Sequence, residues 1–419
     1  MKTKRFLSLF LLIIFLLPLT GCWDYHDFDD LTLVSAMGFD MEEGTNEITV
    51  TVQYYIPGAG NVNGSGGGLS KLPMAGGAVK ATGKTIADAI LKIQESRRKT
   101  LFYGYLNVIV LGENAAKNIT KEVIGFADRT PSVRATAYLA VAEGKAEDVL
   151  CTADPGIATS VGKNIYELID CANQSGAAYP VSIEDFAEKV ATTGTQPVAP
   201  RVTVFITKQL ENENPDESKE DEKPVKVISM NEGYQIVDGM AAFMDFKLVG
   251  WLNAKESTGL SWITDHKLKI YESVNMEPSS DVDIRNVIIF NIKNSKSKIK
   301  VKIEDDKPKI TVSTEIEADM RKYYPGGDEK LTSDALSNLE KKLADNVASE
   351  IMETIKKSQK DLDSDVCNFG FAFYRKYPKL WHEKYEKDWK DIYSEVPINV
   401  EVTAKIQNTG STIIKFVSR

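Results

Sequence analysis

One cysteine near the start of the chain stands where its thiol would be a site of covalent modification. Cys22 follows Leu19, Thr20 and Gly21, directly behind the apolar stretch 6–17. A small residue before a cysteine, behind such a stretch, is typical of the site at which a bacterial precursor receives diacylglycerol on sulfur and is then cleaved. We therefore expect cleavage between Gly21 and Cys22. The mature chain would begin with an N-acylated, S-diacylglyceryl Cys22 in contact with a lipid bilayer.

The segment ahead of this cysteine has the layout of a signal peptide. Lys2, Lys4 and Arg5 precede the apolar stretch, which ends at Pro18 and is too short for a transmembrane anchor of about 20 residues. Each buried methylene of an acyl chain contributes about 0.8 kcal/mol, so two or more chains would hold the mature protein stably. Residues 1–21 are thus expected to be absent from the fold.

One segment resembles a phosphate-binding loop at its end but lacks other features of such a loop. Residues 78–85 end in Gly83-Lys84-Thr85 at the start of an expected helix, but Ala78 stands where the first glycine of such a loop is required. The segment also follows a glycine-rich stretch and not a strand. Capping of the helix by Thr85 explains the motif, and no cofactor is expected.

Metal-assisted and nucleophilic catalysis also lack a recognisable constellation. His382 and Glu383 begin an HExxH-like pattern, but Glu386 replaces the second histidine. The chain has three histidines and, beside Cys22, three cysteines without CxxC spacing: Cys151, Cys171 and Cys367. A disulfide between Cys151 and Cys171 and buried free thiols both stay open. No catalytic and no metal-binding residue is predicted.

Apolar periodicity indicates the elements of the first half of the mature chain. Strands over 31–39 and 47–55 are expected to form a hairpin, and a helix from Thr85 to about Arg97 leads to a strand over 101–111. A second helix is predicted over about 114–128, with a strand near 133–142 after it. Helices over 163–175 and 183–190 and a strand over 201–207 complete this domain.

The second half begins after residues 211–224, where seven acidic residues and two lysines mark a solvated linker. Paired strands over 234–251, a helix over 255–263 and strands near 267–271 and 284–291 are predicted next. A hairpin of 299–303 with 310–316, a long helix and a last strand over 398–406 follow. The apolar stripe of the long helix is Leu336, Leu339, Leu343, Val347, Ile351 and Ile355.

These patterns predict an α+β protein of three mixed α/β domains with largely antiparallel sheets, after the cleaved lipoprotein signal peptide. The expected parts are a signal peptide (1–21), an N-terminal domain (22–210), an acidic linker (211–224), a small middle domain (225–295) and a C-terminal domain with the long helix (296–419).

The overall charge narrows the class of partner. The formal net charge is -9, and removal of residues 1–21 takes away three positive charges and lowers it to -12. Such a chain is not expected to bind nucleic acid, and anionic lipid headgroups would repel it on average. The acyl anchor, and not a basic patch, is therefore expected to hold it at a membrane.

Short motifs distributed along the chain carry a family resemblance. They are Gly21–Asp24, Asp30–Leu31, Met37–Asp40, Ala81–Thr85, Gly104–Ile109, Lys247–Leu252, Thr258–Trp262 and Phe371–Pro378. In order and spacing these motifs resemble the Ger(x)C lipoproteins, the C subunits of nutrient-germinant receptors in spore-forming bacteria. The resemblance spans nearly the whole mature chain.

The resemblance implies a non-catalytic subunit, lipid-anchored on the outer face of the spore inner membrane, that associates with A-type and B-type receptor membrane subunits. It also implies a fold of three mixed α/β domains. The glycines and aromatic residues of the motifs are expected mostly to serve turns and cores. Two other classes are the alternatives: a solute-binding lipoprotein that serves a membrane transporter, and a surface hydrolase that acts on peptidoglycan.

Overall fold

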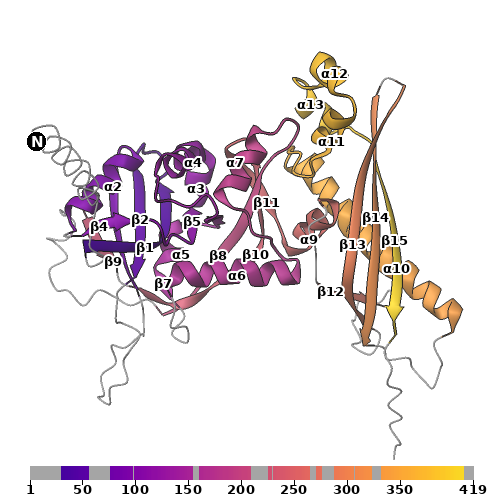
Figure 1. The fold of residues 1–419 in the computed structure, drawn as a ribbon, viewed down its shortest axis with the longest axis horizontal. Coiled ribbons are helices and arrows are strands. Elements are labelled where there is room, and N and C mark those ends of the chain that lie inside the picture. The colour runs from indigo at the N-terminus through magenta and orange to yellow at the C-terminus, as the bar shows by residue number, and fades with distance from the viewer. Residues whose placement is uncertain are drawn as a thin grey trace, which may run out of the picture.

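The computed structural model describes residues 30–55, 76–97, 99–153, 160–208, 225–228, 230–264, 270–275, 287–305, 307–322 and 332–409. Within these ranges the chain forms an eleven-stranded sheet and a four-stranded sheet. Figure 1 shows an elongated molecule, with the larger sheet at the left and centre and the smaller sheet at the right.

The larger sheet is mixed, with parallel strands at its centre and antiparallel strands toward both edges. Its strand order is β11-β10-β8-β6-β5-β1-β2-β3-β9, with β4 beside β1 and β7 beside β10. The strands are β1 (Leu31–Met41), β2 (Ile48–Tyr55), β3 (Gly76–Gly83), β4 (Thr100–Phe102), β5 (Val108–Leu111), β6 (Tyr138–Ala142), β7 (Thr152–Ala153), β8 (Val198–Lys208), β9 (Val225–Ile228), β10 (Asn231–Met244) and β11 (Lys247–Leu252).

Helices cover the middle of this sheet. Strand β1 is buried at every position from Thr32 to Asp40, as expected for a central strand whose two faces are both covered. Helices α3, α5 and α6 all contact it. The helices of this half are α2 (Ile86–Glu95), α3 (Glu113–Asn118), α4 (Thr120–Arg129), α5 (Ala146–Leu150), α6 (Val161–Ser175) and α7 (Ile183–Ala191).

The smaller sheet has the order β12-β13-β14-β15, and its last strand runs parallel to β14. Helix α10 contacts β15 and β12, and α11 contacts β13. The elements of this half are α9 (Ala254–Ile263), β12 (Tyr271–Asn275), β13 (Val287–Glu304), β14 (Lys307–Lys322), α10 (Ser333–Lys356), η4 (Lys357–Asp361), α11 (Phe369–Lys376), α12 (Pro378–Leu380), η5 (Trp381–Tyr385), α13 (Trp389–Tyr393) and β15 (Ile398–Asn408).

The α+β class predicted from the sequence is confirmed, and so are its strongest local features. Strands β1 and β2 form the expected hairpin, as do β13 and β14. In α10 the predicted stripe is buried from Leu339 to Ile355, and only its first member, Leu336, is half-buried. Thr85 caps α2, because its side-chain oxygen accepts a hydrogen bond from the backbone N–H of Asp88 at 3.1 Å.

Two predicted elements are divided in the structure. The strand expected over 101–111 is two strands, β4 and β5, because the backbone turns between them: the N–H of Leu106 bonds to the carbonyl of Tyr103 at 2.9 Å. The helix expected over 114–128 is also two, α3 and α4, because at Ile119 the φ and ψ angles of -128° and 14° leave the helical region.

The range predicted as a middle domain contributes to both sheets. Strands β9, β10 and β11 belong to the larger sheet, where β9 pairs with β3 and β10 pairs with β8. Strand β12 and the start of β13 belong to the smaller sheet. The linker 211–224 lies outside the described residues, and the three-domain division stays a prediction.

Candidate functional site

The predicted lipidation site lies outside the part of the chain that the structure describes. The described residues begin at position 30, whereas cleavage and acylation are predicted at Gly21 and Cys22. The modification therefore stays a prediction. No helix among the described residues is long and apolar enough to cross a bilayer.

The segment that ends in Gly83-Lys84-Thr85 is built as a strand and a helix cap. Residues 76–83 form β3, which pairs with β2 on one side and with β9 on the other. No strand was predicted here, and this prediction is wrong, because residues 76–83 form β3. The backbone N–H groups of a paired strand are used by its neighbours, so the segment does not form an open loop of amides of the kind that cradles phosphate.

The other residues weighed for catalysis or metal binding are dispersed. The Nδ1 atom of His382 lies 2.8 Å from a carboxylate oxygen of Glu386, one helical turn away on the surface. No group of three or more His, Cys, Asp and Glu side chains within the described ranges is arranged to hold a metal ion. Cys151, Cys171 and Cys367 are free, and burial raises the pKa of the thiols of Cys151 and Cys367.

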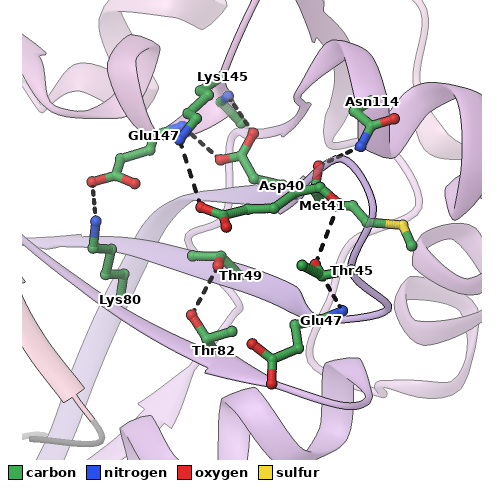
Figure 2. A network of polar contacts seen from close by, with 12 residues as sticks. Asp40, Met41, Thr45, Glu47, Thr49, Lys80, Thr82, Asn114, Lys145 and Glu147 are labelled. Atoms are coloured by element: carbon green, nitrogen blue, oxygen red, sulfur yellow. Dashed lines mark hydrogen bonds and ion pairs between the residues drawn. The ribbon is translucent and has the colours of Figure 1, made fainter. Parts of the chain in front are cut away.

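The most developed polar site centres on Asp40 at the end of β1. Its carboxylate accepts hydrogen bonds from the backbone N–H groups of Ala146 and Glu147, at 2.8 and 2.9 Å, where α5 begins (Figure 2). The side chain is 6% exposed, and this burial raises its pKa from 3.8 to about 6. Asp40 therefore fastens the start of α5 to the central strand of the sheet.

Polar side chains from several elements surround Asp40 (Figure 2). Lys80 of β3 forms an ion pair with Glu147 at 2.5 Å, and the amide of Asn114 donates to the carbonyl of Met41 at 2.6 Å. Together they border an open pocket of about 820 Å³. Its lining is Asp40, Met41, Glu42, Glu43, Thr49, Lys80, Ala81, Thr82, Glu113, Asn114, Lys117, Gly144, Lys145 and Glu147.

Charges of both signs in this pocket suit the binding of a polar group more than bond cleavage. The carboxylate of Asp40 is already bonded to two backbone amides, and Lys80 is paired with Glu147. Asp40 belongs to the motif Met37–Asp40, for which the sequence predicted no chemical role. The hydrogen bond from the Ala146 N–H to the Asp40 carboxylate joins residues 106 positions apart, so local patterns do not predict it. The available signal for a polar site was an acidic residue at the end of a buried strand.

The motif around Gly259 and Trp262 packs the crossing of α9 on α10. A Cβ atom on Gly259 would lie 2.5 Å from the carbonyl oxygen of Glu350, so α10 approaches as closely as only glycine allows. The indole N–H of Trp262 donates to the Glu350 carboxylate at 3.2 Å. Burial raises the pKa of Glu350 and of Glu272, two carboxylates that share the amide of Asn346.

The motif Phe371–Pro378 also serves packing. Phe373 is fully buried, and its ring lies 4.9 to 6.0 Å from the rings of Tyr377, Trp381, Tyr385 and Trp389. Aromatic clusters of this kind contribute through burial and edge contacts. This motif and the one around Gly259 and Trp262 therefore serve packing.

The nearby loop carries another buried carboxylate. Asp365 accepts hydrogen bonds from the backbone N–H groups of Phe369 and Gly370 and from the indole of Trp389, at 2.6 to 3.0 Å. Burial raises its pKa to about 6. These bonds fix the start of α11 and lay it against Gly194 of the other half of the molecule.

Comparison with known proteins assigns these features to one family. A family model described as the spore germination protein N-terminal domain matches residues 24–204. A second, described as the spore germination B3/GerAC-like C-terminal region, matches residues 238–410. The two matches account for most of the chain.

Curated relatives match over nearly their full length. Spore germination protein KC of Bacillus subtilis (strain 168) is 27% identical, over 97% of this chain and 96% of the relative. Spore germination protein B3 of the same organism is 24% identical, over 98% of this chain and 99% of the relative. Spore germination protein GerQC of Bacillus cereus is 23% identical, with the same two coverages as B3.

A solved structure shares the fold. The crystal structure of the GerBC protein matches with a TM-score of 0.54 and 21% identity, over 90% of this chain and 98% of that chain. At this identity the match supports the architecture alone. The two family models, the full-length relatives and the shared fold together show that this chain belongs to the Ger(x)C family of spore germination proteins.

Proposed function

We propose that this protein is the non-catalytic, lipid-anchored C subunit of a spore nutrient-germinant receptor. The observation that carries the proposal is the pair of family matches over 24–204 and 238–410. Relatives named as spore germination proteins align with it from end to end. The role would be to assemble or stabilise the receptor, or to transmit its response, with A-type and B-type membrane subunits as partners.

Attachment to the membrane would come from Cys22. The chain would lie on the outer face of the spore inner membrane, with the described fold beginning eight residues after the acylated cysteine, at Asp30. A short tether of this kind keeps the fold close to the bilayer without a membrane-spanning segment.

The described fold suits an assembly role. Two of its buried carboxylates, Asp40 and Asp365, are bonded to backbone amides at helix starts. Such bonds hold helix starts against neighbouring elements, and surfaces that change little on binding are common in preorganised complexes.

Co-purification from spore inner membranes tests this function. Tagged wild-type protein is expected to bring down A-type and B-type receptor subunits and to carry a diacylated Cys22 in mass spectrometry. A Cys22→Ala variant is expected to lose the lipid and most of its membrane association. Normal germination of spores that lack the gene, with every nutrient tried and with no second receptor present, would contradict the proposal.

The pocket beside Asp40 gives the solute-binding alternative a specific test. A ligand of a transporter-linked lipoprotein would be sought in this polar space of about 820 Å³. Calorimetry with candidate nutrients, on wild-type protein and on a Lys80→Gln variant, would detect it. Tight binding that the variant loses would favour the alternative.

A further inference from the structure

Strand β13 presents a row of lysines on one face of the smaller sheet. Lys296, Lys298, Lys300 and Lys302 occupy every second position and are all exposed. The residues between them face the other way, and Val301 is buried at 1% exposure in the core. At about 3.3 Å per residue, the four ammonium groups extend along about 20 Å of a rigid strand.

The carboxylates near this row neutralise only part of its charge. In the described part of the chain none of these four ammonium groups has a carboxylate within 4 Å, and the nearest ion pair on this face joins Lys309 to Glu304. The positions opposite the row on β14 are Glu315, Ser313, Thr311 and Lys309. Lys302 interacts electrostatically with Glu304, and Glu315 lies opposite Lys296, so these carboxylates offset part of the charge and leave the row net positive.

The edge of the strand away from β14 is partly covered by α11, where the Lys376 ammonium donates to the backbone carbonyl of Val301 at 2.5 Å. Strand β12 pairs only with residues 287–291 of β13, so the described strands leave the lysine-bearing part unpaired on that side. Lysines on an edge strand also discourage association between sheets, and that role alone would explain exposed charge. Protection of the edge does not require a positively charged side chain at four consecutive outward positions.

We propose that the lysine row of β13 is a second membrane contact, which binds the anionic surface of a lipid bilayer. The row consists of evenly spaced, hydrated ammonium groups, and it has no arginine, aromatic ring or pocket that would recognise one defined acidic peptide. Such point charges are better suited to the many phosphate groups of a planar lipid surface. The net charge of -9 conceals this local feature. The row would add to the acyl anchor, which is still expected to hold the chain at the membrane.

The position of the row would fix how the molecule lies. Figure 1 places β1, the first strand after the predicted anchor, toward one end of the long axis and β13 toward the other. This step rests on the proposed lipid anchor at Cys22. Two attachments far apart would lay the long axis along the bilayer, and the tether would raise the effective concentration of the lysines there.

A vesicle experiment tests the lysine row without any receptor partner. Full-length protein would be mixed with vesicles of pure phosphatidylcholine and with vesicles that contain phosphatidylglycerol, and the ratio of the two partition coefficients measured. Lys2, Lys4 and Arg5 of the N-terminal segment also favour anionic vesicles, but equally in every variant, so the change of the ratio between wild type and variant measures the contribution of the row. Lys296→Gln, Lys298→Gln, Lys300→Gln and Lys302→Gln combined are expected to reduce this ratio at least tenfold at low salt.

A matched control removes the same charge elsewhere. Lys99→Gln, Lys121→Gln, Lys341→Gln and Lys356→Gln affect four exposed lysines that form no row, one before β4, one in α4 and two in α10, and are expected to change the ratio less than threefold. Equal losses in both variants would overturn the proposal, since net charge alone would then decide. An unchanged ratio with aggregation of the row variant would assign the lysines to edge protection and overturn it too.

The same variants separate a lipid from a protein partner. If the row variant keeps its vesicle ratio but no longer co-purifies with receptor subunits, the row binds an acidic protein surface and the lipid proposal fails. If the ratio falls while wild-type protein finds no receptor subunits, the lipid proposal stands and the proposed receptor function fails.

Discussion

At the scale of single residues, Asp40 combines burial with a structural hydrogen-bonding role. Its pKa of about 6 in the fold lies above the ordinary 3.8 because burial disfavours the charged form. The folded chain therefore binds this proton more tightly than the unfolded chain does. The stability linked to the proton is complete below pH 3.8 and is lost as the pH rises through about 6.

An Asp40→Asn variant should remove this pH dependence. Denaturant unfolding at several pH values gives the free energy of unfolding of each protein. The difference, wild type minus variant, is expected to fall by up to about 3 kcal/mol between pH 4 and pH 7. Asp88→Asn is the control, because the pKa of Asp88 is lowered by its bond to the Lys84 amide and its contribution changes with pH in the opposite direction. A pH-independent difference for Asp40→Asn would contradict this account.

The network around Asp40 shows why the site was hard to predict. Its partners lie in β3, α3 and α5, and each contact depends on strand order in the sheet. Thr85, by contrast, bonds to a residue three positions on, and its capping role followed from the sequence. Local hydrogen bonds can be predicted from spacing, whereas contacts between distant strands require the topology.

At the scale of elements, the crossing of α9 on α10 is set by one glycine. Gly259 lies inside α9, where glycine lowers helix stability by roughly 0.5–1 kcal/mol relative to alanine. The helix carries it because α10 runs so close that a methyl group would overlap the Glu350 carbonyl. The close contact of α9 with α10 therefore requires a residue that lowers the intrinsic stability of α9.

A pair of glycine substitutions separates these two effects. Gly259→Ala is expected to reduce the free energy of unfolding by about 1–3 kcal/mol, through overlap with α10. Gly125→Ala in α4 meets only the flexible end of Arg129, at 3.2 Å, and is expected to raise it by about 0.5–1 kcal/mol. Thermal or denaturant unfolding measures both. If both variants were stabilised, the close approach of α9 and α10 would not hold in solution.

The elements that the sequence predicted well are those with long, regular patterns. Helix α10 and the hairpin of β13 with β14 bury alternate faces over many residues, so periodicity identifies them. The split of β4 from β5, and the parallel pairing of β15, depend on a turn and on sheet order. Neither leaves a periodic signal in the sequence.

At the scale of the whole molecule, the two halves meet at a contact between glycine backbones. The backbone N–H of Phe371 donates to the carbonyl of Gly194 at 2.8 Å, and that of Gln196 donates to the carbonyl of Asp365 at 3.2 Å. The hydroxyl of Ser364 donates to the carbonyl of Phe243 at 2.6 Å. These bonds connect the loop before β8, and β10, to the helical cluster beside the smaller sheet, and they favour unfolding of both halves as one unit.

Gly194→Ala tests this coupling. Gly194 has a φ of 72°, and an added Cβ would lie 2.5 Å from the backbone carbon of Gly370. Gly44→Ala is the matched control, because Gly44 has a similar φ of 75° and open space around it. Both variants carry strain of about 1–2 kcal/mol from the left-handed backbone. Only Gly194→Ala is expected to split the calorimetric unfolding transition in two, and a single transition in that variant would contradict the coupling.

The strand order also determines when each sheet can be completed while the chain is being synthesised. Strand β9 completes one edge of the larger sheet only after more than half of the chain has been made, and β15 supplies the last strand of the smaller sheet. Until residues 398–408 emerge, the long edge of β14 has no partner. The nascent chain thus carries this unpaired strand edge from the completion of β14 until β15 emerges, a state in which sheets are prone to pair wrongly. Ribosome-stalled or truncated chains that end before Ile398 should therefore be the most aggregation-prone forms of this protein.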